Sequence, residues 1–144
     1  MKVFTIGFTQ KRAEQFFSML DRPDIVRIVD IRLKNNSQLA GFTRGADMPF
    51  LLERLVGKGY VHEPRLAPSD EILTAYRNNK IDWPEYERRF LVLLDERRVR
   101  ETVDPGLLDG GCLLCSEPEP DRCHRRLVAE YISGYLPHVT IQHL

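Results

Sequence analysis

The chain has 144 residues, of which 42% are hydrophobic and 29% are charged, and its 21 lysines and arginines balance its 21 aspartates and glutamates. This length suffices for one domain with a hydrophobic core and is short for two. The zero net charge gives no indication of a nucleic-acid partner, although a local basic patch stays open. No apolar run reaches the length that spans a bilayer, so we expect no membrane partner.

The start of the chain does not have the pattern of a signal peptide. Its apolar stretch is short and ends at Thr9, and no small-residue cleavage site follows it. The three cysteines, Cys112, Cys115 and Cys123, cannot all pair with one another. A reducing compartment would keep them as thiols, and we therefore expect a cytoplasmic protein.

The first part of the chain alternates strand and helix patterns. Residues 2–8 and 25–31 are rich in β-branched and aromatic side chains and predict strands. Residues 11–20 between them have the apolar spacing of a helix, for which Thr9 is a candidate N-cap. A polar loop follows over residues 33–45, and a loop of this length in a compact domain is often functional.

The middle of the chain continues the alternation. Residues 48–56 predict a helix that Asp47 can cap, and residues 60–63 predict a short strand. Two helices follow, one over residues 69–79 and one that begins after Asp82.

The last part of the chain returns to the sheet. Residues 104–106 have the composition of a turn, and residues 112–115 predict a strand. Asp121 can cap a helix over residues 122–134, and residues 139–142 predict a final edge strand.

This order of elements predicts one α/β domain over residues 1–144. Its mostly parallel sheet should have four to five strands, with helices on both faces and right-handed connections. The strand order stays open. Because ligands bind at the carboxyl edge of an open parallel sheet, the residues that follow each strand are candidates for a site.

Reactive and charged side chains gather at these predicted strand ends. For catalysis, Cys115 is a candidate nucleophile or substrate-contacting thiol, and Asp30, His62 and Glu117 are candidates to move protons. The candidate substrate-binding residues lie at strand ends, in the long loop and at the start of the last helix: Gly7, Thr9, Arg32, Phe42, Cys123, His124 and Arg125.

Successive motifs resemble those of a bacterial and archaeal family known as domain of unknown function 488. They are TIGFT, VDIR, GF, YVHEP, WPEYERRF and LLCSEPEPDRCHR, in this order along almost the whole chain. The last motif, with its cysteine and its cysteine-histidine-arginine block, is the most specific. The family usually has histidine or tyrosine where this chain has Phe8, and the segment PRLAP departs from the family pattern. The resemblance implies an α/β domain and implies no established reaction.

Several candidates have a structural interpretation beside the functional one. Cys115 either packs in the core or reacts. Asp30 and Arg32 either form an ion pair that ties a loop, or hold a ligand through the carboxylate and the guanidinium fork. Phe42 either fills the core or stacks on a ligand.

The start of the last predicted helix favours anion binding. Helical spacing turns Cys123 and His124 toward the sheet and leaves Arg125 partly buried. Free N–H groups of a first turn, the positive end of the helix dipole and an inward arginine together suit an anion. On this interpretation, Arg125→Ala would abolish anion binding and leave stability near that of the parent.

Metal and redox chemistry are competing interpretations of Cys115, Cys123 and His124. Adjacent residues rarely both reach one ion, and the C-x-x-C pairs of structural zinc sites and thiol oxidoreductases are absent. We therefore expect no metal. The chain also lacks the glycine-rich loops that hold nucleotides tightly, so we expect no cofactor.

The leading hypothesis is an enzyme with a small anionic substrate, phosphate-bearing and nucleotide-like, at the carboxyl edge of the sheet. One alternative is a non-catalytic module that binds nucleic acid or a protein through exposed arginines. Another is a metal or redox sensor that uses Cys115, Cys123 and His124. The oligomeric state stays open.

Overall fold

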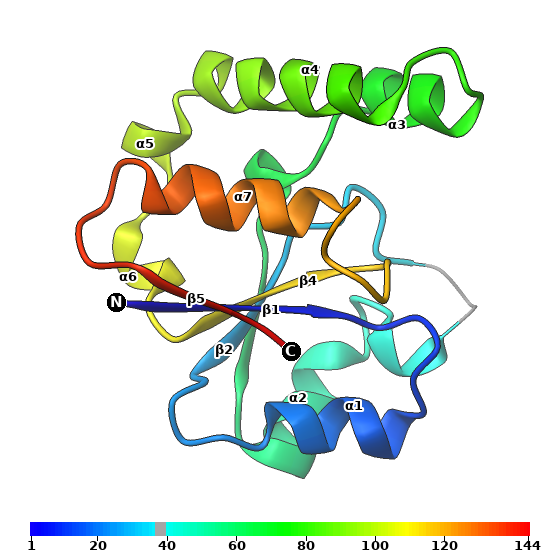
Figure 1. Cartoon of the computed structure of the whole chain (residues 1–144). Coiled ribbons are helices and arrows are strands. Elements are labelled where there is room, and N and C mark those ends of the chain that lie inside the picture. The colour runs from blue at the N-terminus through cyan, green and yellow to red at the C-terminus, as the bar shows by residue number, and fades with distance from the viewer. Residues whose placement is uncertain (37–39) are drawn as a thin grey trace.

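The computed structural model describes residues 1–36 and 40–144. In this part of the chain, five parallel strands form one sheet in the order β3-β2-β4-β1-β5, with helices on both faces (Figure 1). This confirms the predicted α/β fold. The strands are β1 Lys2–Gly7, β2 Arg27–Asp30, β3 Gly59–His62, β4 Gly111–Cys115 and β5 Thr140–His143. The predicted polar loop includes residues 37–39, which lie outside the described residues.

The helices form a layer on each face of the sheet (Figure 1). One layer contains α1 and α2, and the other contains α3, α4 and α7, with the short α5 and α6 completing the link back to the sheet. Two 3-10 turns, η1 Gly41–Thr43 and η2 Pro64–Leu66, lie in the connections after β2 and β3. The helices are α1 Ala13–Leu20, α2 Met48–Val56, α3 Asp70–Arg77, α4 Trp83–Glu96, α5 Val99–Thr102, α6 Pro105–Leu108 and α7 His124–Ser133.

The strands separate two hydrophobic cores because successive side chains of a strand point to opposite faces. On β1, Phe4 and Ile6 pack in the core beneath α1 and α2, whereas Val3 packs in the core beneath α4 and α7. On β4, Cys112 is fully buried in the α1–α2 core. Burial on both faces explains why these strands are continuous apolar runs.

Asp47 is the N-cap residue of α2 as predicted, although its side chain makes no cap hydrogen bond; two other predicted helix caps are wrong. Helix α1 begins at Ala13 with Arg12 as its N-cap, and the hydroxyl of Thr9 instead donates to the carbonyl of Ser116 at 2.6 Å. Helix α7 begins at His124, so Asp121 lies before its N-cap residue. The local sequence suggested a helix start in both places. Thr9 makes a tertiary contact instead, and at Asp121 the loop continues further.

Parallel pairing brings the carboxyl ends of all five described strands to one edge of the sheet. The register places Gly7 beside Cys115 and Asp30 beside His62, as the strand-end argument predicts. Among the described residues, no helix combines the length and the apolar character that crossing a membrane requires.

Candidate functional site

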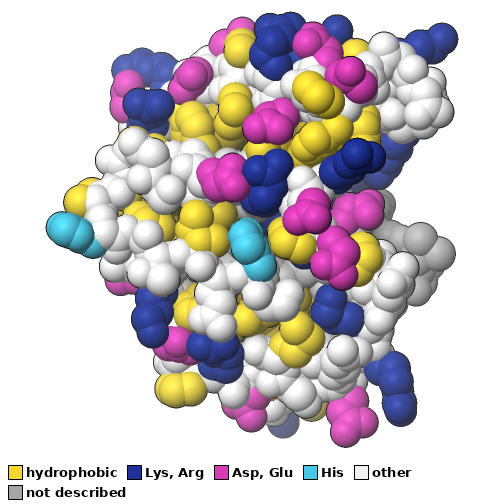
Figure 2. All heavy atoms as spheres, in the orientation of Figure 1, with side chains coloured by type: hydrophobic (Ala, Val, Ile, Leu, Met, Phe, Trp, Pro, Cys, Tyr) yellow, Lys and Arg dark blue, Asp and Glu magenta, His cyan; other side chains and the backbone are white. Residues whose placement is uncertain are grey.

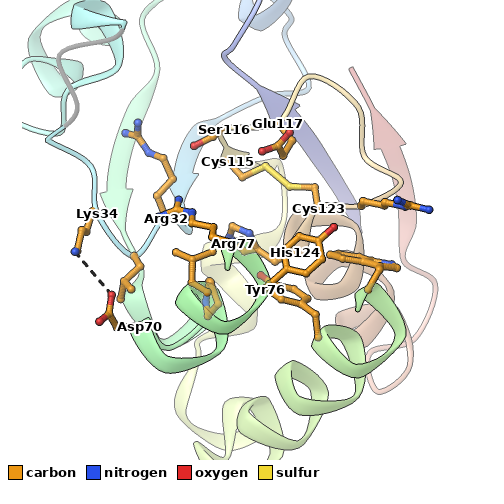
Figure 3. A pocket seen from close by; sticks show the side chains of 16 residues that line it. Arg32, Lys34, Asp70, Tyr76, Arg77, Cys115, Ser116, Glu117, Cys123 and His124 are labelled. Atoms are coloured by element: carbon orange, nitrogen blue, oxygen red, sulfur yellow. Dashed lines mark ion pairs between the residues drawn. A yellow bond between two sulfur atoms is a disulfide. The ribbon is translucent and has the colours of Figure 1, made fainter. Parts of the chain in front are cut away.

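A cavity of about 170 Å³ lies at the carboxyl edge of β2 and β4 (Figure 3). Its walls come from the segments that follow these strands, from α3 and from the start of α4. Four cationic side chains and two acidic ones line it: Arg32, Lys34, Arg77 and Arg122, with Asp70 and Glu117. Lys34 and Asp70 pair at an exposed position, 3.8 Å apart. Arg32 is paired in turn with Asp30, so Arg77 and Arg122 are the lining cations that suit an anion.

Aromatic rings form one wall of the cavity. The rings of Trp83 and Tyr86 stack with centroids 4.8 Å apart, and Tyr76 meets Trp83 edge-on at 5.7 Å. Trp83 and Tyr86 share one side of α4 because they are three residues apart. The cap from Asp82 to the backbone N–H of Glu85 fixes where that helix begins. This wall offers a planar ligand a flat apolar surface beside the cations.

Two sulfurs lie in the lining of the same cavity. Cys115 ends β4, Cys123 is the N-cap residue of α7, and a disulfide joins them (Figure 3). Their residues are only 1% and 3% exposed, so solvent reaches the sulfurs hardly at all. The chain between them forms a loop of seven residues, 116–122, which carries Ser116 and Glu117 into the lining.

Arg125 supports this loop through hydrogen bonds from the side away from the cavity. Its side chain is 0% exposed, and its guanidinium donates to the carbonyl oxygens of Glu117 and Pro118 and to the Sγ of Cys115, the last at 3.1 Å. Arg125 does not line the cavity. Within the described residues its acceptors are therefore backbone carbonyls and a sulfur, whereas the sequence suggested a ligand anion.

Gly7 and Thr9 support the same loop. A Cβ at Gly7 would overlap the carbonyl oxygen of Glu117 and lie 2.7 Å from Nη1 of Arg125. Only glycine leaves the room for this close approach. Thr9 binds Ser116 through its hydroxyl and its backbone N–H, at 2.6 and 3.1 Å. Neither residue lines the cavity, so both act on the site through the loop.

Asp30 and Arg32 form a buried ion pair. Nε and Nη2 of Arg32 donate to the two carboxylate oxygens of Asp30, both at 2.8 Å, and the residues are 4% and 0% exposed. The hydroxyl of Tyr60 donates to the same carboxylate at 2.6 Å, and Arg32 also reaches the carbonyl of Thr43. Burial and this bond to Asp30 raise the pKa of Tyr60 to about 12. The pair therefore ties the loop after β2, and only Arg32 reaches the cavity.

The two candidate histidines both donate to backbone carbonyls. Nε2 of His62 lies 2.8 Å from the carbonyl oxygen of Arg32, and Nε2 of His124 lies 2.7 Å from that of Ile31. A carbonyl only accepts, so in each ring Nε2 carries a proton. His124 lines the cavity and His62 does not. Burial lowers the pKa of His124 to about 4, which keeps the ring neutral at neutral pH.

This pKa predicts a pH dependence of stability. The pKa of His124 falls from 6.5 in a solvated chain to about 4 in the fold, so between these values the unfolded chain binds the proton. Stability should decrease as pH falls from about 6.5 to 4, by up to about 1.4 kcal/mol per pH unit, and this contribution is constant above 6.5. In His124→Gln, whose amide can still donate to Ile31, urea unfolding at several pH values in metal-free buffer should give a flatter profile. Equal slopes in the two proteins would contradict this assignment.

The structure brings part of the predicted site together. Five of the candidates line the cavity: Arg32, Cys115, Glu117, Cys123 and His124. Five others lie outside the lining: Gly7, Thr9, Asp30, His62 and Arg125. Phe42 packs against the rings of Phe16 and Phe17 on the opposite face of the sheet, with centroids 5.5 and 6.0 Å away, so it belongs to the α1–α2 core.

Sequence reasoning missed the wall made by α3 and α4. Tyr76, Arg77 and Trp83 line the cavity, but they lie within or at the start of helices rather than at strand ends. Trp83 and Tyr86 fall in the WPEYERRF motif, whose aromatic residues three apart were the available signal.

Fold and cavity together define a single-domain α/β protein with a cysteine–histidine site at the carboxyl edge of a parallel sheet. Residues 12–132 match the family model described as domain of unknown function DUF488, and the chain belongs to this family. The match includes the whole cysteine loop and both helices of the aromatic wall. No curated protein and no solved structure matches the chain.

Proposed function

We propose that the protein is an enzyme that binds a small, planar anion of the nucleotide kind in the cavity at the carboxyl edge. The cavity itself carries this proposal, because its lining combines cationic side chains, an aromatic wall and sulfur. An aromatic ring of the ligand would stack near Trp83 and Tyr86, and its phosphate would meet Arg77 and Arg122.

The reacting groups would be the ones that reach the ligand. Cys115 is the thiol that a bound substrate meets once the disulfide is reduced, and the guanidinium of Arg125 favours its thiolate from 3.1 Å away. Glu117 is the candidate that moves protons, since Asp30 and His62 lie outside the lining. Asp30, Gly7, Thr9 and Arg125 would keep these groups in place.

The contacts of the exposed arginines favour a small ligand over nucleic acid. Arg98 pairs with Glu101, and Arg126 pairs with Glu130, so their charges are largely compensated. On the face in Figure 2, basic and acidic side chains are interspersed rather than gathered in one basic patch. A nucleic-acid-binding surface would need phosphate contacts from a continuous basic stripe.

Trp83 is the only tryptophan of the chain and lines the cavity, so its fluorescence reports on the site. Adenosine and cytidine monophosphates should change this fluorescence saturably. Replacing Arg77 and Arg122 together by alanine should weaken the affinity about tenfold or more, as loss of charge-assisted contacts does. The double variant Arg54→Ala with Arg44→Ala, which removes two arginines outside the cavity lining, is the matched control and should bind like the parent.

A ligand found in this way also tests catalysis. Cys115→Ser should retain the fluorescence change while conversion of the ligand, followed by mass spectrometry, is lost. No saturable change with any nucleotide, or equal affinities in the cavity and control variants, would contradict the proposed site.

A further inference from the structure

Three potential metal ligands converge in the lining of the cavity. The Sγ atoms of Cys115 and Cys123 and a ring nitrogen of His124 all lie within 4.8 Å of one another. The adjacency of Cys123 and His124 argued against a shared ion, because neighbouring side chains usually diverge. Here Cys123 is extended, with φ −138° and ψ 139°, and His124 is the first helical residue, so the backbone bend turns both side chains to one point.

The histidine is oriented as a ligand histidine is. Its Nε2 donates to the carbonyl of Ile31 at 2.7 Å, which fixes the ring and leaves the lone pair on Nδ1. The ring also meets Phe90 edge-on at 5.8 Å. Metal-binding histidines characteristically donate their other ring N–H to a carbonyl or carboxylate in this way.

The sulfurs have the surroundings of ligand thiolates. Both are buried, and the guanidinium of Arg125 donates to the Sγ of Cys115, which offsets negative charge on that sulfur. The Cα atoms of Cys115 and Cys123 are 7.6 Å apart, whereas disulfides mostly join Cα atoms about 4.4–6.8 Å apart. The backbone is thus wide enough for two separate thiolates on one ion.

From this convergence we infer that the reduced protein binds a thiophilic divalent cation, for which Zn²⁺ is the natural probe, through Cys115 Sγ, Cys123 Sγ and His124 Nδ1. Zinc takes thiolate sulfur at about 2.3 Å and imidazole nitrogen at about 2.0 Å in a tetrahedron. Two sulfurs and one nitrogen occupy three positions. Because all three residues line the cavity, the fourth position would be open to a ligand there, as in a catalytic zinc site rather than a structural one.

Binding starts from the dithiol. Reduction of the Cys115–Cys123 bond adds two electrons and two protons, which a phosphine and water supply in the test while the phosphine becomes its oxide. Zinc then displaces the two thiol protons. The disulfide and the metal therefore exclude each other, and oxidation of the pair releases the ion.

This inference goes beyond the proposed function and does not rest on it. A metal at this point would present its open position to whatever occupies the cavity, and Cys115 would then act as a ligand of the ion rather than as a free thiol. Nucleotide binding to chelator-treated protein, read from Trp83, tests the proposed function alone. Metal binding without nucleotide tests the inference alone.

Cobalt(II) is the spectroscopic probe for the test. Protein reduced with a phosphine and freed of it should bind one Co²⁺ per chain, with thiolate-to-cobalt charge-transfer bands and the intense visible bands of a tetrahedral ion, and Zn²⁺ should displace it. Cys123→Ser and His124→Ala should each weaken Co²⁺ binding at least tenfold. Cys112→Ala removes the third cysteine, which is buried in the α1–α2 core, and should keep the full spectrum.

A second measurement needs no variant. Parent protein oxidised to the disulfide should show no cobalt bands, and Zn²⁺ should protect Cys115 and Cys123 of the reduced protein from alkylation. The inference is overturned if reduced parent protein shows no charge-transfer band. It is also overturned if the bands persist in Cys123→Ser or in the oxidised protein.

Discussion

Replacing Asp30 with alanine is expected to lower the free energy of unfolding by about 3–5 kcal/mol, the cost of removing one partner of a buried ion pair. Arg32 would keep its charge in the interior, where it is 4% exposed, without the carboxylate that accepts two of its hydrogen bonds. Tyr60 would lose its acceptor as well. Urea unfolding followed by circular dichroism measures the loss.

The control for Asp30 is an exposed pair. Glu101→Ala breaks the contact with Arg98, whose side chain is 70% exposed, and should change stability little because solvent screens such pairs. The sequence placed Asp30 among the catalytic candidates. A stable Asp30→Ala variant that binds ligand and fails to convert it would restore that role and refute the structural one.

The second large effect is expected from Arg125→Ala, with a loss of about 2–4 kcal/mol from a buried cavity and from unpaired polar groups. Without the guanidinium, the carbonyls of Glu117 and Pro118 lose a donor in the interior. The loop from Ser116 to Arg122 should then be cleaved more readily by proteases, because the hydrogen bonds from Arg125 to its carbonyls are lost. This reverses the outcome that the helix pattern alone suggested.

Arg126→Ala is the matched control for Arg125. This arginine follows directly in the chain; it pairs with Glu130 at 3.0 Å and donates to a single loop carbonyl, that of Asp121, at 3.2 Å. Its loss should lower stability far less and should increase cleavage of the loop far less than Arg125→Ala does. If Arg125→Ala kept the parent's stability and lost the nucleotide response of Trp83, Arg125 would be a ligand-binding residue after all.

The fold was predictable because its signals are local. Residues 2–8 and 112–115 are apolar runs with the composition of strands, and the helices between strands have their own apolar periodicity. Alternation of the two elements leaves few topologies, most with a parallel sheet. The failed caps at Thr9 and Asp121 have different causes: Thr9 makes a tertiary contact with Ser116, which is distant in the sequence, whereas the loop continues past Asp121 to Cys123.

The sequence predicted at which edge of the sheet the site lies, but not which side chains form it. Parallel strands place Cys115, Arg32 and Glu117 near one another whatever the details, and the strand-end argument found them. It could not tell which side chains face the cavity, because that depends on packing. The carboxylate of Asp30 accepts hydrogen bonds from Arg32 and Tyr60, and the guanidinium of Arg125 donates to carbonyls of the loop over residues 116–122, so neither group is free for a ligand. The aromatic wall depends on how α3 and α4 dock on the sheet, which no strand end reveals.

The absence of a side chain at Gly7 limits how much the length of the loop between Cys115 and Cys123, residues 116–122, can vary. The carbonyl of Glu117 already lies against β1, where a Cβ would overlap it. The loop therefore cannot move closer to β1, and deleting residues from it would pull Cys115 away from Cys123. An insertion meets no such barrier if it enters after Pro118, where residues 119–122 are largely exposed. Added residues would bulge outward there and reshape the mouth of the cavity while its sulfur-lined floor stayed fixed. A protein engineer who wished to admit a larger ligand would therefore lengthen this segment and leave position 7 alone.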